Sequence, residues 1–190
     1  MLSSARLRAV FIPFLLASFC GIAQANESKQ MLAKIEEQLV KPKASGFEAC
    51  KPGTLRTKDF VVLYFSAHWD HGSKEATPEL VEFYEQAKKK HQNFEIVFIS
   101  SDKDEKEMLR FMNGYKMPWL ALKFKKQHDV DGLIKHAGRA IPSVAVLDAE
   151  GKLVAHSFEE KTGKYQGVLK PVEAMKRMLD SQSNRLVSMR

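Results

Sequence analysis

The sequence predicts an α/β fold, with a central mixed sheet, helices on both faces and an additional N-terminal helix. Residues 60–65 are an unbroken apolar run and residues 94–99 form a second buried-strand pattern, as is typical of strands covered on both sides. Helical periodicity follows each run, at 72–87 and 103–112, which indicates parallel strands joined by right-handed crossovers. An antiparallel hairpin at 143–156, turning at Asp148-Ala149-Glu150-Gly151, then makes the sheet mixed.

The N-terminal helix is expected over residues 28–40. Its apolar residues recur at helical spacing and form one face, made of Met31, Leu32, Ile35 and Leu39. Lys41-Pro42-Lys43 ends this helix, because proline is not accommodated in a helix interior, and a loop rich in glycine and lysine leads to Lys58. Residues 26–44 are therefore expected to be an N-terminal helix and linker that precede the main domain.

The last third of the chain contributes the remaining elements. A short segment lies around 117–120, and a helix is expected near 130–136. Pro171 suits the first turn of the last helix, whose apolar stripe consists of Val172, Met175 and Leu179. The main domain is expected to cover residues 45–180, followed by a C-terminal tail at 181–190.

The first 25 residues have the three-part pattern of a secretory signal peptide. Arg6 and Arg8 precede an apolar run at 9–23, which ends in the small residues of Ala23-Gln24-Ala25. The run is shorter than the roughly 20 apolar residues of a membrane span, although an uncleaved anchor is the alternative. We expect cleavage before Asn26 and export to the periplasm or the exterior, with no membrane attachment afterwards.

The net charge does not predict a nucleic-acid partner. Removing residues 1–25 takes away two arginines and no acidic residue, which lowers the formal net charge from +7 to +5. The lysine-rich stretches alternate with acidic residues, as solvated helix faces do, and no nucleic-acid-binding motif accompanies them. We therefore expect no nucleic acid among the partners.

The expected mature chain keeps a single cysteine, Cys50. An intramolecular disulfide is then impossible, although an exported protein would meet oxidising conditions. A lone cysteine is most often a small buried apolar residue, and pairing with a second molecule is the alternative.

Four short motifs follow one another along the chain. They are Tyr64-Phe65-Ser66-Ala67-His68-Trp69, then Lys74 with residues 77–84, then Met117-Pro118-Trp119-Leu120-Ala121, and finally Ile141-Pro142-Ser143. In this order they resemble the tryparedoxin and nucleoredoxin branch of the thioredoxin-like superfamily. The resemblance covers roughly residues 45–180 and implies a thioredoxin fold, with Pro142 at the position where the family has a cis-proline.

The departure from the family lies at its reaction centre. The resemblance implies a C-x-x-C pair directly after Trp69, but Asp70 and Ser73 occupy the two cysteine positions. Neither residue can form a mixed disulfide, so a conventional dithiol mechanism is excluded and we assign no catalytic residue. Asp and Ser are both good helix N-caps, and a carboxylate keeps a negative charge at the helix start. One interpretation is therefore that Asp70 and Ser73 only stabilise this turn.

The resemblance also implies a binding groove that needs no sulfur. In this chain the groove residues would be Trp69, His71, Gly72, Ile141 and Pro142, with Trp119 nearby. Backbone pairing with an extended peptide would supply affinity, and side-chain pockets would supply selectivity. Both tryptophans could instead be core residues; we favour the core for Trp119 and the groove for Trp69. The expected function is non-catalytic or chaperone-like binding of a peptide or protein, without a cofactor.

Two alternatives keep a chemical activity. His68, Asp70 and His71 are three candidate Zn or Cu ligands within four residues. Cys50 could act as a one-cysteine redox site if its thiol were exposed and acidic, and Asp70 with His71 could form a hydrolytic pair. The runner-up hypothesis is thus a redox-related or metal-handling protein.

Overall fold

The computed structural model describes residues 16–188, so the first part of the expected signal peptide, residues 1–15, lies outside the described residues. The helices are α1 (Leu16–Glu37), α2 (His71–Lys88), α3 (Glu105–Gly114) and α4 (Leu169–Ser188). The strands are β1 (Leu39–Lys43), β2 (Gly46–Ala49), β3 (Phe60–Ser66), β4 (Phe94–Ser100), β5 (Leu120–Leu122), β6 (Ser143–Asp148) and β7 (Leu153–His156). Two 3₁₀ helices, η1 (Phe124–Asp129) and η2 (Ile134–His136), follow β5.

The strands form one mixed sheet in the order β2-β1-β5-β4-β3-β6-β7. β3 pairs in parallel with β4 and antiparallel with β6, so Leu63 lies between Val97 and Ala145. Every residue of β3 and β4 is buried, as the apolar runs predict for central strands. The expected mixed sheet with its antiparallel hairpin is therefore confirmed.

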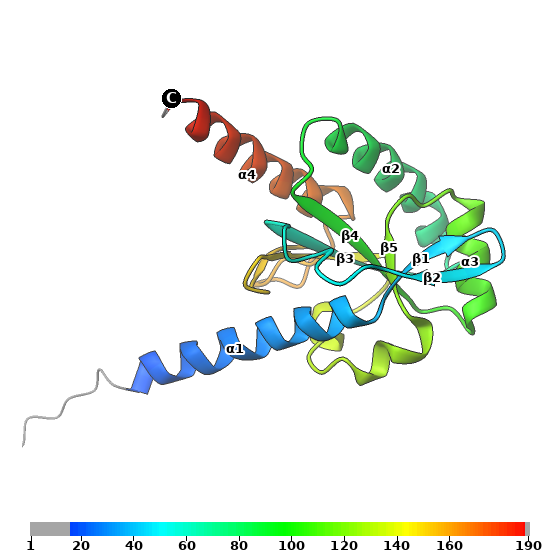
Figure 1. The fold of residues 1–190 in the computed structure, drawn as a ribbon, viewed down its shortest axis with the longest axis horizontal. Helices are drawn as coiled ribbons and strands as arrows, with labels where there is room; N and C mark the ends of the chain where they lie inside the picture. Colours follow the sequence, from blue (N-terminus) through cyan, green and yellow to red (C-terminus); the bar gives the residue numbers. More distant parts are fainter. Residues whose placement is uncertain (1–15, 189–190) are drawn as a thin grey trace, which may run out of the picture.

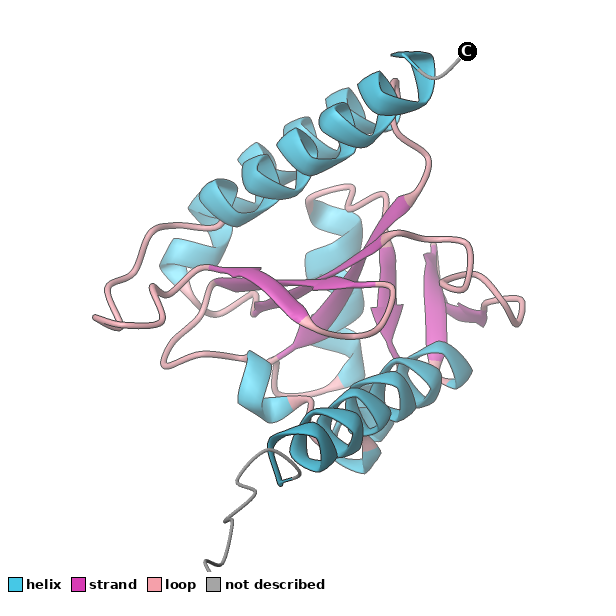
Figure 2. Ribbon diagram, turned by 90° about the vertical axis from the view of Figure 1, so that its left-hand side faces the viewer, coloured by secondary structure: helices cyan, strands magenta, loops and turns pink. Residues whose placement is uncertain are grey.

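Helices cover both faces of this sheet (Figures 1 and 2). Side chains alternate along β3, so Val62 and Tyr64 pack in the cluster that contains residues of α2, α3 and α4. Leu63 and Phe65 point the other way, into the cluster that contains Met31 and Ile35 of α1. Figure 2 shows α1 and α4 on opposite sides of the sheet.

The expected linker after the N-terminal helix is wrong. α1 ends at Glu37, and residues 39–43 form β1, which pairs with β5 through Leu39 and Val40. Burial of these two apolar residues favours the strand. Their helical spacing had led to the prediction that they belong to the N-terminal helix. Pro42 lies beyond the two positions that pair with β5, so its missing N–H removes no hydrogen bond on that side. The main domain therefore begins before residue 45.

Two further expectations differ from the structure. The helix expected near 130–136 is not an α-helix, because Val130 is extended and Gly132 has a φ of +79°; only η2 forms there. The expected tail at 181–190 is helical as far as Ser188. Residues 181–188 contain neither glycine nor proline, so nothing in the sequence stops α4 after the buried Leu179.

The expected signal-peptide cleavage site lies inside α1, which runs through residue 26 without interruption. Within residues 16–188, no helix has both the length and the apolar composition that crossing a bilayer requires.

Candidate functional site

α2 begins at His71, shortly after β3 ends at Ser66. Asp70 is the N-cap of this helix: its backbone is extended, and its Oδ2 accepts the Ser73 N–H at 2.6 Å. Ser73 is fully buried in the first turn, where its hydroxyl accepts the Ala67 N–H at 3.4 Å. Thr77 donates to the Ser73 carbonyl at 2.6 Å. The two residues at the family's cysteine positions therefore have different roles, since Asp70 caps the helix and Ser73 packs beneath it.

Trp69 projects from the same turn and is 63% exposed. Its indole N–H donates to the Ser101 carbonyl at 2.9 Å, which fixes the ring on the loop after β4. Tryptophan is enriched among the residues that dominate binding at interfaces, so Trp69 is a candidate recognition residue.

The loop before β6 lies against this turn. The Ile141–Pro142 peptide bond is cis. A Cβ placed on Gly72 would lie 3.2 Å from Pro142 Cδ, so a larger residue at this position would require the proline to move by a few tenths of an ångström. Within residues 16–188, the backbone N–H and carbonyl of Ile141 make no hydrogen bond, so both are free to pair with an extended segment. We call Trp69, His71, Gly72, Ile141 and Pro142 the Trp69 surface.

Tyr165 belongs to this region, although the sequence did not indicate it. Its hydroxyl donates to the Pro142 carbonyl at 2.9 Å, and its side chain is 44% exposed. Burial raises the pKa of Tyr165, and the charge of Asp70 raises it further. Tyr165 lies in the irregular segment after β7, where no pattern of the sequence predicts its position.

Asp102 stabilises the segment that precedes Trp69. This buried carboxylate accepts the His68 N–H and the Ser100 hydroxyl, each at 2.7 Å. Burial raises its pKa, and the two hydrogen bonds only partly offset that effect. Asp102 thus ties the end of β4 to the segment that leads into Trp69.

The raised pKa of Asp102 gives a pH-dependent prediction. An unfolded aspartate titrates near pH 3.9. As pH rises from about that value through the raised native pKa, the native protein holds more protons than the unfolded chain, so the free energy of unfolding falls. Asp102→Asn keeps an acceptor for His68 and removes the buried charge. We expect this variant to be more stable than the wild type at pH 7, with a difference that shrinks toward pH 4.

Urea unfolding at several pH values measures this difference. Asp102→Ala is the control, because it leaves the His68 N–H without its acceptor; it should lose about 1–3 kcal/mol at each pH. A wild type that is more stable than Asp102→Asn at pH 7 would contradict the prediction.

Trp119 does not belong to the Trp69 surface. It is fully buried, and its ring packs edge-on against Tyr64 at 6.0 Å and Tyr84 at 5.6 Å. Trp119 directly precedes β5, and its side chain packs in the core between the sheet and α2. The structure thus has Trp119 in the core, as the favoured interpretation had it, and the alternative place beside the groove is wrong.

The three candidate metal ligands point to different partners. His68 Nδ1 lies 3.5 Å from a Glu107 carboxylate oxygen, and the exposed His71 lies 3.2 Å from Glu75, one turn further along α2. Asp70 is engaged in capping α2. Within the described part of the chain, no three His, Cys, Asp or Glu residues are grouped as metal ligands.

Cys50 is half-buried at the end of β2, on the α1 face of the sheet. β1, β5 and β4 lie between β2 and β3 in the sheet, and no residue at the start of α2 lines the cavity that Cys50 lines. Burial raises the pKa of Cys50, which lowers the fraction of reactive thiolate. The arrangement does not favour a one-cysteine redox site.

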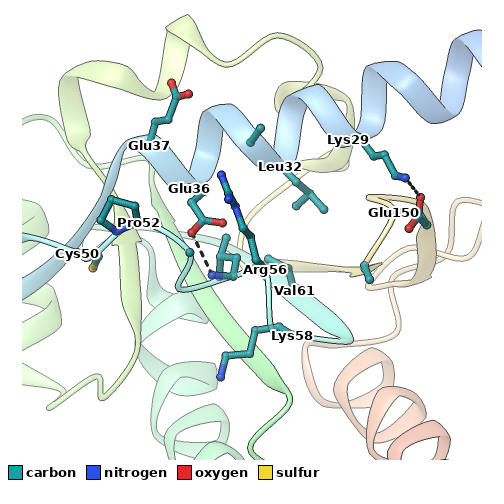
Figure 3. Close-up of a pocket in the computed structure, with 14 residues that line it drawn as sticks. Lys29, Leu32, Glu36, Glu37, Cys50, Pro52, Arg56, Lys58, Val61 and Glu150 are labelled. Carbon is teal, nitrogen blue, oxygen red and sulfur yellow. Dashed lines mark hydrogen bonds and ion pairs between the residues drawn. The ribbon is translucent and has the colours of Figure 1, made fainter.

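Cys50 lines a cavity of about 550 Å³ beneath α1. In Figure 3, Arg56 extends toward α1, and Glu36 reaches from α1 to accept the Leu55 N–H at 3.4 Å. A second cavity, of about 1140 Å³, runs along β7. Neither cavity is lined by Trp69, Asp70 or Pro142.

Comparisons with known proteins agree on one group of relatives. Residues 58–153 match the family described as Thioredoxin-like. The chain is 37% identical over 94 residues to probable nucleoredoxin 1 of Arabidopsis thaliana, covering 50% of this chain and 16% of that protein. It is 42% identical over 93 residues to tryparedoxin of Trypanosoma brucei brucei, covering 47% of this chain and 61% of the relative. It thus spans less than two thirds of either relative.

Solved structures point the same way. Tryparedoxin from Trypanosoma brucei superposes with a TM-score of 0.54 at 34% identity, covering 66% of this chain and 85% of that one. Tryparedoxin II from C. fasciculata superposes with a TM-score of 0.53 at 29% identity, covering 66% and 84%. The fold expected from the four motifs is therefore confirmed, and by name these relatives are redox-related proteins.

Proposed function

Because this chain belongs to the thioredoxin-like family, in its tryparedoxin and nucleoredoxin branch, we propose that it binds an extended segment of a peptide or protein without catalysing thiol–disulfide exchange. The binding site is the Trp69 surface. A chaperone-like or scaffolding role fits this activity, since neither requires the bound segment to react.

The start of α2 carries the proposal. A dithiol exchanger needs a thiolate at the helix start and a second sulfur to resolve the mixed disulfide. In this chain the first position holds a capping carboxylate and the second a buried hydroxyl. The relatives indicate a redox-related lineage, while the residues at this turn support binding in place of exchange.

The groups that binding requires remain at the same turn. Trp69 offers an exposed aromatic ring, and the free backbone of Ile141 offers one donor and one acceptor to an extended chain. Aromatic side chains in such positions commonly supply most of the binding energy of an interface.

Trp69→Ala should weaken peptide binding about 10-fold or more, because it removes the largest exposed side chain of the surface. Peptides are first selected from a phage-displayed random library on the purified wild-type chain. Fluorescence anisotropy of the labelled peptides then gives the dissociation constant for each variant.

Ile134→Ala is the matched control, since Ile134 is 72% exposed on η2, outside the Trp69 surface. Equal binding by wild type and Trp69→Ala would rule out this surface as the site. Turnover of the wild-type protein in an insulin-reduction assay would overturn the non-catalytic part of the proposal.

The proposal includes export. Arg6 and Arg8, the apolar run at 9–23 and Ala23-Gln24-Ala25 support a cleavable signal peptide with processing before Asn26. The protein would then act in the periplasm or outside the cell, with Cys50 as its single cysteine.

A further inference from the structure

Two exposed aromatic residues, Trp69 and Tyr165, lie near Asp70. Trp69 precedes Asp70 in the chain, and Tyr165 reaches the site through a short series of contacts. Its hydroxyl binds the Pro142 carbonyl at 2.9 Å, and Pro142 packs on Gly72. A Cβ on Gly72 would also lie 3.5 Å from Asp70 Oδ2, so Gly72 lies close to both the carboxylate and the proline whose carbonyl Tyr165 binds.

The polar atoms of both rings are already engaged within the protein. The Trp69 N–H is donated to the Ser101 carbonyl, and the Tyr165 O–H to the Pro142 carbonyl. The Tyr165 ring packs against the Phe158 ring, with centroids 5.2 Å apart and the planes tilted by 51°. These two side chains therefore offer a ligand their ring surfaces but no free hydrogen-bond donor. The face of an aromatic ring carries a partial negative charge.

Asp70 adds a carboxylate to this region. Its Oδ2 accepts the Ser73 N–H, and among residues 16–188 no lysine, arginine or histidine forms an ion pair with it. The influence of Asp70 on the pKa of Tyr165 is consistent with this proximity. Aromatic faces beside a carboxylate are a combination that favours a cation over an anion or a neutral amide.

We propose that the segment bound at the Trp69 surface carries a lysine or arginine side chain, which lies beside Asp70 and contacts the rings of Trp69 and Tyr165. This inference rests on the proposed peptide binding and adds the chemistry of one ligand residue. It also gives the residue at the first cysteine position a role beyond capping, because a neutral cap would hold the helix equally well.

Neighbouring charges limit the strength of this contact. The positive end of the α2 dipole partly compensates Asp70. Lys74 lies one turn further along α2, and Arg139 lies against Gly163, two residues before Tyr165. These positive groups oppose a bound cation, so we expect Asp70 to change affinity by roughly 3- to 10-fold.

The test uses Asp70→Asn, because asparagine is as good an N-cap as aspartate and the helix start should be retained. Phage-displayed peptides are selected in parallel on wild type and on this variant, both as full chains. Wild type should enrich lysine or arginine at one position of the peptides, and Asp70→Asn should lose that preference. The best wild-type peptide should bind Asp70→Asn roughly 3- to 10-fold more weakly, with a smaller loss of affinity when salt is raised.

Two further arms separate the possible outcomes. Lys74→Gln should tighten the lysine-containing peptide, because it removes an opposing charge, and exchanging that peptide lysine for glutamine should cancel both effects. Peptides that depend on Trp69 but show no positional basic preference would overturn the cation inference and leave the binding proposal intact. If no selected peptide depends on Trp69, the proposed function itself fails.

Discussion

Asp70→Cys combined with Ser73→Cys is expected to give clear turnover in an insulin-reduction assay with dithiothreitol, whereas we expect none from the wild type. Cysteine at 70 would start α2, where unpaired N–H groups and the helix dipole stabilise a thiolate. The Ser73 N–H is directed at the Asp70 carboxylate, so it would be available to sulfur. Cysteine at 73 would occupy a buried position in the same turn, where a resolving thiol is protected.

The double variant should also be less stable than the wild type when reduced. Cysteine does not replace the short capping hydrogen bond of Asp70, and the loss of an N-cap costs about 0.5–2 kcal/mol. Asp70→Cys alone is the matched control, because it provides a nucleophile without a resolving partner and should not turn over. Folded double variant with no reductase activity would show that the site has diverged beyond its two sulfurs.

Trp119→Ala should have the largest effect on stability. The side chain is fully buried between two tyrosine rings, and truncation of a large buried aromatic residue costs about 3–5 kcal/mol. Trp119→Phe should cost much less, because it keeps most of the packing. It also removes an indole N–H that has no partner among the described residues.

Urea unfolding followed by far-ultraviolet circular dichroism measures the loss. Folded Trp119→Phe should bind selected peptides as the wild type does, which distinguishes it from Trp69→Ala. A Trp119→Phe variant of unchanged stability that no longer binds the peptides would instead indicate that Trp119 belongs to the binding site.

We expected Trp69 at the groove and Trp119 in the core, and the structure shows why the exposure of the two side chains differs. Both are tryptophans that lie close to the end of a strand. Trp69 is nevertheless 63% exposed, whereas Trp119 is fully buried. The difference arises because Trp69 follows β3, where the chain turns out of the sheet, whereas Trp119 immediately precedes β5 and is covered by α2. Exposure of a side chain depends on what packs over it, and that element is distant in sequence.

The N-terminal region shows a limit of periodicity. Leu39 continues the spacing of Met31 and Ile35, so the sequence predicted a helix through residue 40. The chain instead enters the sheet after Glu37, because Leu39 and Val40 gain burial and hydrogen bonds by pairing with Leu122 and Ala121 of β5. Pairing across more than 80 residues leaves no local signal in the sequence.

What the sequence by itself determined is the fold and the absence of the dithiol. Long apolar runs have few ways to be buried, and no arrangement of the chain can supply sulfur atoms that Asp70 and Ser73 lack. What only the tertiary structure decided is the character of the turn that replaces the dithiol. In the tertiary structure, Asp70 is a capping carboxylate and Ser73 is a buried hydroxyl. The fold also places Tyr165 against Pro142, 23 residues away in the sequence. The reason is physical: chemical identity is local, whereas the surroundings of a group are set by packing between segments far apart in the chain.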